Sequence, residues 1–133
     1  MKWIFLFLLV LSGTTCLCAE GDTKPTIVTP LLTKEFPKET GSEGRMLIVE
    51  FAPGGASKPH SHPGAIFAYV LEGSVVSGLN NEEAKTYKTG ECWYEEPGCV
   101  HSVSRNASAT VKARLLVFFV TQPGKPVVIP AKE

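Results

Sequence analysis

The chain has 133 residues, enough for one domain, and its 13 basic and 13 acidic residues give a formal net charge of zero. The basic residues are scattered and form no run. This charge distribution gives no indication of a nucleic-acid partner or an anionic membrane surface, so neither is expected for the mature protein.

Residues 1–19 have the pattern of a secretory signal peptide. Lys2 supplies a positive start, residues 3–11 are apolar, and small residues follow. Nine apolar residues are too few to cross a hydrocarbon layer that requires about twenty. We expect cleavage after Cys18 or Ala19 and a secreted or periplasmic mature protein; an uncleaved membrane anchor is the alternative.

The rest of the chain has the pattern of short strands and turns that is typical of an all-β domain. We expect residues 20–44 to form an extended N-terminal arm with one short strand near 26–32. Residues 123–133 are expected to form a C-terminal tail. Between them, short apolar runs separated by Gly and Pro predict strands at residues 46–51, 65–71, 74–77, 84–88, 91–94, 100–104 and 111–121. No stretch has sustained helical periodicity. Seven or more short strands at this spacing favour a single-domain sandwich or barrel.

All three histidines of the chain fit one arrangement. His60 and His62 are separated by one residue, so on a strand their imidazoles would point to the same face. His101 follows a Pro-Gly turn about forty positions later. A neighbouring strand that carries His101 would complete a cage of three nitrogens for a divalent metal ion.

Residues 53–74 read PGGASKPHSHPGAIFAYVLEGS, which resembles the first motif of the cupin family. That motif has a glycine, five residues, His-x-His, a glutamate a few residues later, and a glycine after six more. Gly54, His60, His62 and Gly73 fill the matching positions.

Residues 90–106 read GECWYEEPGCVHSVSRN, which is similar to the second cupin motif. Gly90, Pro97, Gly98 and His101 match it, although Pro97 lies one position later than usual. The resemblance implies a jelly-roll β-barrel over residues 45–122 with a metal ion in its mouth. It also implies His60, His62 and His101 as ligands, the residues that strand parity indicates.

The sequence departs from the family pattern at Ile66, where many cupins have a glutamate ligand. Strand alternation places Ile66, Ala68 and Val70 on the inward face. We therefore expect a site without a carboxylate, similar to the three-histidine centres of zinc hydratases and thiol dioxygenases. Such a site would bind Mn²⁺ less well than Zn²⁺, Cu²⁺ or Ni²⁺. The metal stays open among Fe, Zn, Cu, Ni and Mn, and a packed histidine cluster without metal is the alternative.

Other charged residues are weaker candidates. Glu50 is expected to face solvent; the alternatives are a general base or a hydrogen-bond partner of a ligating imidazole. Glu95 and Glu96 precede a turn and are predicted to be solvated. Asn106 begins an N-glycosylation sequon on a loop, which has meaning only in an organism that glycosylates secreted proteins.

Aromatic and cysteine residues leave several alternatives. Tyr69 is out of phase with the histidines and is expected on the outer surface. Trp93 and Tyr94 alternate, so one of the two should face inward. Cys92 and Cys99 either form a disulfide or remain thiols, and Cys99 could also approach the metal.

Three functions are compatible with these features, and no catalytic residue can be assigned. The first is a metal-dependent enzyme; by family analogy, this would be an oxidoreductase of dioxygenase type. The second is a non-enzymatic module that holds a small ligand in an apolar pocket. The third is a scaffold that forms a homodimer through outward aromatic residues such as Phe67 and Tyr69.

Overall fold

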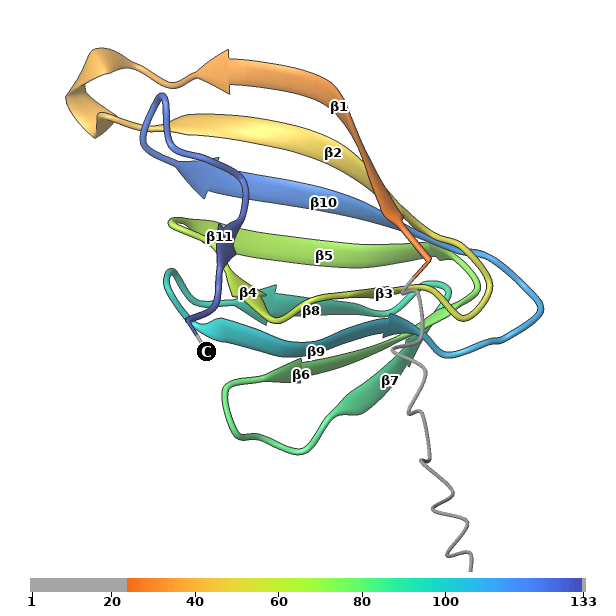
Figure 1. Ribbon diagram of the computed structural model, residues 1–133. Helices are drawn as coiled ribbons and strands as arrows, with labels where there is room; N and C mark the ends of the chain where they lie inside the picture. Colours follow the sequence, from red (N-terminus) through yellow and green to blue (C-terminus); the bar gives the residue numbers. More distant parts are fainter. Residues whose placement is uncertain (1–23, 133) are drawn as a thin grey trace, which may run out of the picture.

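The computed structural model describes residues 24–132, and the predicted signal peptide lies outside the described residues. Within residues 24–132 the fold is all-β, with one 3-10 turn, η1 (Lys38–Thr40), and no α-helix. Two antiparallel sheets face each other (Figure 1). This is the jelly-roll architecture that the sequence predicts.

The first sheet has five strands. In spatial order they are β1 (Thr26–Glu35), β2 (Glu43–Phe51), β10 (Ala113–Thr121), β5 (Ala65–Glu72) and β8 (Cys92–Glu95). The predicted N-terminal arm thus forms a ten-residue strand that pairs with β2 along its length.

The second sheet has six strands. They are β11 (Ile129–Pro130), β4 (His60–Ser61), β9 (Val100–Asn106), β6 (Ser74–Leu79) and β7 (Lys85–Lys88), with β3 (Ala56–Ser57) also paired to β9. The predicted tail therefore contributes a short strand that pairs with β4 (Figure 1). All seven predicted strands are present, with ends shifted by up to three residues.

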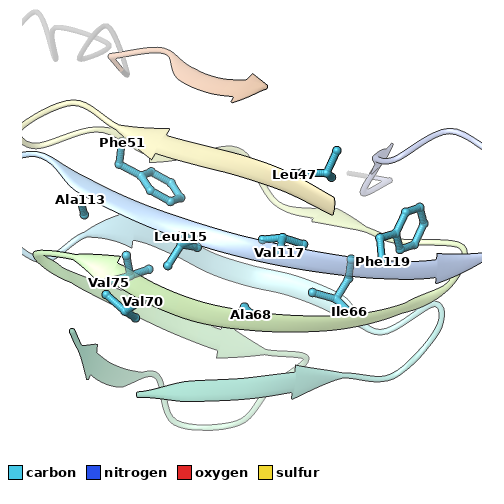
Figure 2. Packing of buried hydrophobic residues seen from close by; sticks show 10 residues of the cluster. All are labelled: Leu47, Phe51, Ile66, Ala68, Val70, Val75, Ala113, Leu115, Val117 and Phe119. Carbon is cyan, nitrogen blue, oxygen red and sulfur yellow. The ribbon is translucent and has the colours of Figure 1, made fainter. Parts of the chain in front are cut away.

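Alternating side chains explain why these strands form a closed interior. Along β5 the buried residues Ile66, Ala68 and Val70 alternate with exposed Phe67 and Tyr69. The inward apolar side chains of several strands meet between the sheets (Figure 2). This core consists of Leu47, Phe51, Ile66, Ala68, Val70, Val75, Ala113, Leu115, Val117 and Phe119.

Glycine allows the close turns that bring these strands together. Gly73 joins β5 to β6 at φ +74°, and a Cβ there would lie 2.6 Å from the carbonyl oxygen of Lys112. Gly64 connects β4 to β5, and a Cβ there would clash with the carbonyl oxygen of Val120. The loop that follows the histidines is therefore packed directly against backbone.

Candidate metal centre

The three histidines converge inside the barrel. His60 on β4 is the direct antiparallel partner of His101 on β9, and His62 follows β4. The ring centroid of His60 lies 4.9 Å from that of His62 and 5.2 Å from that of His101. One nitrogen of each ring lies within 4.8 Å of the other two, so the cluster is capable of holding a metal ion.

Backbone carbonyls fix two of the three rings. The Nδ1 of His60 lies 2.7 Å from the carbonyl oxygen of Lys58, and that of His62 lies 2.6 Å from the carbonyl oxygen of Val127. A carbonyl can only accept a hydrogen bond, so in each ring Nδ1–H is the donor. The lone pair of Nε2 is then free in both rings, which is the form that binds a metal.

His101 is oriented differently. Its Nε2 lies 2.9 Å from the Ser77 hydroxyl, and its Nδ1 lies 3.3 Å from Oε1 of Glu95. If Nε2–H donates to Ser77, the lone pair of Nδ1 faces the cluster. No sequence pattern singles out Ser77, which contacts the site from β6.

The surroundings keep the imidazoles neutral. Burial is the main cause that lowers the pKa of His60 and of His62. Burial, followed by repulsion from His60 and His62, lowers the pKa of His101 to about 3. Neutral imidazole is the form required for metal coordination.

Glu95 lies beside the histidines, which corrects the sequence prediction. Its side chain is 2% exposed, whereas it was predicted to be solvated. Oε1 accepts a hydrogen bond of 2.9 Å from Nε1 of Trp93, and Oε2 lies 3.6 Å from Nε2 of His62. Burial raises the pKa of Glu95, and the Trp93 hydrogen bond and attraction to His60 oppose this rise. The prediction of a site without a carboxylate is therefore wrong.

The sequence contained a signal for this placement. Trp93 and Glu95 are two residues apart on β8, so both point to the same face. Trp93 lines the interior and Tyr94 is exposed, which settles the alternation that the sequence left open. Once Trp93 faces inward, Glu95 must do so too. Glu96 is exposed, as predicted.

A cavity of about 400 Å³ adjoins the cluster, and most of its walls are apolar. Ile66 and Ala68 point into it from β5, as predicted. Val127 and Val128 close part of it from the C-terminal segment. Lys58 is the one lysine or arginine among the described residues that line the cavity. The shape and lining suit a small organic ligand.

The remaining candidates lie away from the cluster. Glu50 faces outward, with its Oε1 3.3 Å from Nε of Arg114, so it is not a partner of the imidazoles. Tyr69 is exposed on the outer face, as predicted. Cys92 and Cys99 are free thiols and do not form a disulfide with each other.

Asn106 ends β9 and is only 3% exposed, although the sequence placed it on a loop. Its Nδ2 donates to the carbonyl oxygens of Ala52 at 3.0 Å and Val111 at 2.7 Å, and its Oδ1 accepts from Ser108 N at 2.9 Å. The nitrogen that a glycan would modify is thus used to tie three segments together.

The model of the cupin domain matches residues 47–119, which is more than half of the chain. The chain belongs to the cupin family. Germin-like protein subfamily T member 2 of Arabidopsis thaliana is 38% identical to this cupin over 78% of the chain and 49% of the relative. Oxalate oxidase GF-3.8 of Triticum aestivum is 31% identical over 77% of the chain and 49% of the relative.

A solved structure of oxalate oxidase with the substrate analogue glycolate superposes with a TM-score of 0.61 at 25% identity. The match covers 87% of this cupin and 61% of that chain. This cupin spans about half the length of the curated relatives that it matches. Within residues 24–132 the structure contains no helix long and apolar enough to cross a membrane.

The residues at the site fit a divalent metal ion of the kind that the family implies. Three imidazole nitrogens form a suitable donor set, and Oε2 of the buried Glu95 has no hydrogen-bond partner among residues 24–132. An unpartnered buried carboxylate oxygen is costly unless a cation or donor approaches it.

Proposed function

We propose that this cupin is a secreted protein that binds one divalent transition-metal ion through His60, His62 and His101 and oxidises a small, largely apolar molecule. The observation that carries the proposal is the cluster of three imidazole nitrogens within 4.8 Å of one another beside a cavity of about 400 Å³. When bound, a transition metal with open coordination positions supplies Lewis-acid or redox chemistry.

The side chains that line the cavity would bind and orient the ligand, and no proton-transfer role is assigned to them. Ile66, Ala68 and Val117 provide apolar walls that hold an organic ligand and exclude water from the ion. Lys58 is the one lysine or arginine described in the lining, so apart from the metal ion the cavity offers little to balance a small dianion. We therefore expect an aromatic or aliphatic ligand with an oxygen or sulfur atom that can bind the metal.

Metal analysis of the untagged mature protein tests the binding step. We expect close to one transition-metal ion per chain, with loss of the ion in His60→Ala and in His101→Ala. Ser61 lies between two of the proposed ligands, so Ser61→Ala is the matched control. This variant should keep the metal. A wild-type protein that takes up no Fe, Zn, Cu, Ni or Mn would refute the proposal.

Oxygen consumption tests the oxidation step. The metal-loaded protein is mixed with flavonoid and thiol substrates, and the His101→Ala variant serves as the blank. We expect uptake of oxygen that depends on the metal and on His101. Metal binding without turnover over the whole panel would refute the enzymatic proposal.

A non-enzymatic binding module is the second candidate. The observation that favours it is the cavity lining, in which Glu95 and the histidines are the acid–base groups near the cluster. A protein that uses all of these as metal ligands has no separate general base. Retention of an apolar ligand by the metal-loaded protein, without turnover, would establish this function.

Homodimer formation is a separate part of the proposal. Phe67, Tyr69, Tyr94 and Phe118 are exposed together on the outer face of β5, β8 and β10, where they line a shallow apolar groove. Such a face is typical of a subunit contact. Light scattering on the wild type and on Phe67→Glu would test it, with a monomeric wild type as the refuting result.

A further inference from the structure

The carboxylate beside the histidines lies on β8, next to the strand that carries the glutamate in many cupins. Ile66 occupies the usual position on β5, and its direct antiparallel partner on β8 is Glu95. Paired residues on adjacent antiparallel strands point to the same face, with their Cβ atoms about 5 Å apart. Both side chains are 2% exposed, so both lie inside the barrel.

The contacts of Glu95 divide its two oxygens between two roles. Oε1 receives the Trp93 indole N–H at 2.9 Å and lies 3.3 Å from Nδ1 of His101. Oε2 lies 3.6 Å from Nε2 of His62 and has no hydrogen-bond partner among the described residues. Trp93 thus orients the carboxylate through Oε1 and leaves Oε2 free beside Nε2 of His62.

No permanent positive charge in residues 24–132 balances this carboxylate. The basic groups within 4.0 Å of it are the His62 and His101 rings, and no Lys or Arg of the described part of the chain is so close. A buried carboxylate normally pairs with a cation or coordinates a metal. A divalent ion at the centre of the histidine cluster would satisfy Oε2.

We propose that Glu95 is the fourth metal ligand of this cupin, supplied from β8 in place of the glutamate that Ile66 replaces, and that Trp93 positions it. The inference rests on the proposed metal binding by the three histidines. It makes the donor set three imidazoles and one carboxylate, with a net charge of −1 before the metal binds. Such a set accommodates Mn²⁺ and Fe²⁺ better than three imidazoles alone.

The test compares metal affinity in Glu95→Gln, Glu96→Gln and the double variant Ile66→Glu/Glu95→Ile. Affinity for Mn²⁺ and Zn²⁺ is measured by competition with a chelator, and bound metal is counted by elemental analysis. Glu95→Gln should weaken Mn²⁺ binding about 10- to 100-fold, with a smaller loss for Zn²⁺. Glu96→Gln, on the exposed neighbour, should bind like the wild type.

The double variant returns the carboxylate to the usual family position. It should recover most of the Mn²⁺ affinity that Glu95→Gln loses, because the new carboxylate lies directly opposite the one that is removed. Trp93→Phe keeps the carboxylate but removes its hydrogen bond, and should give an intermediate loss.

The outcomes separate this inference from the proposed function. If the wild type binds no metal, the metal centre itself is refuted. If the wild type binds metal and Glu95→Gln binds it equally well, only the role of Glu95 is refuted. If Glu95→Gln is poorly folded, Trp93→Phe decides: a folded Trp93→Phe variant that binds Mn²⁺ as tightly as the wild type overturns the inference, and one with weakened Mn²⁺ binding supports it.

Discussion

The C-terminal segment should control metal affinity although it carries no ligand. A stop codon after Gln122 keeps β10 intact and removes the Val127 carbonyl that accepts the hydrogen bond from His62 Nδ1 at 2.6 Å. Loss of such a partner typically weakens metal binding about 10- to 100-fold, or about 1.4 to 2.7 kcal/mol. The truncation also removes the pairing of β11 with β4 and the contact of Val127 with the core.

The loss of stability can be estimated from the same contacts. A backbone hydrogen bond contributes about 1 kcal/mol net, and partial burial of a valine contributes about 1 kcal/mol. With the Ala131 N–H to Pro59 bond of 3.1 Å and the His62 bond both lost, we expect about 3 kcal/mol. At about 4 °C per kcal/mol, the melting temperature should fall by about 12 °C.

Calorimetric metal titration and thermal melts measure the two effects separately. The matched control is Val127→Ala, which keeps the carbonyl and trims the apolar contact, so it should lose some stability but little metal affinity. A truncated chain that binds metal as tightly as the wild type would refute the role assigned to Val127. Equal losses of affinity in both variants would assign the effect to packing instead.

Two further predictions concern the scaffold. Asn106→Ala removes the short hydrogen bonds to Ala52, Val111 and Ser108 and should lower the free energy of unfolding by about 3 kcal/mol in denaturant titrations. In the wild type, the intact mass should show no glycan at Asn106 after eukaryotic secretion. An Asn106-linked glycan on folded protein would contradict this. Gly64→Ala should lower the free energy of unfolding by at least about 3 kcal/mol, because its Cβ would clash with the Val120 carbonyl. The control is Gly54→Ala, at φ +71° with no atom near the added Cβ, which should lower it by only about 1–2 kcal/mol in the same assay.

Strand positions and the histidine cluster could be predicted because they depend on local patterns. The alternation of Ile66, Ala68 and Val70 reports directly which face of β5 is buried. The His-x-His spacing places two imidazoles together whatever the rest of the barrel does. The pairing of His60 with His101 followed once both residues were assigned to neighbouring strands.

The contacts that complete the site could not be read from local patterns. The bond between His62 and the Val127 carbonyl joins residues 65 positions apart and involves no side chain of Val127, so no residue type signals it. Asn106 has the sequence of a surface sequon, yet its amide replaces backbone pairing between segments that only the folded chain brings together. Both contacts depend on which segments meet at the ends of the strands, and sequence periodicity does not describe this.

Glu95, the proposed fourth ligand, illustrates why a motif position is an incomplete guide to where a carboxylate meets a histidine cluster. A metal ion binds where donor atoms lie close together in space, whichever strand carries them. In a barrel each inward position has a neighbour at a similar depth on the adjacent strand. The register that pairs Ile66 with Glu95 therefore lets either strand deliver a carboxylate to nearly the same region. The absence of glutamate at position 66 changes the strand that carries the charge and the group that orients it, here Trp93, without removing the charge from the site.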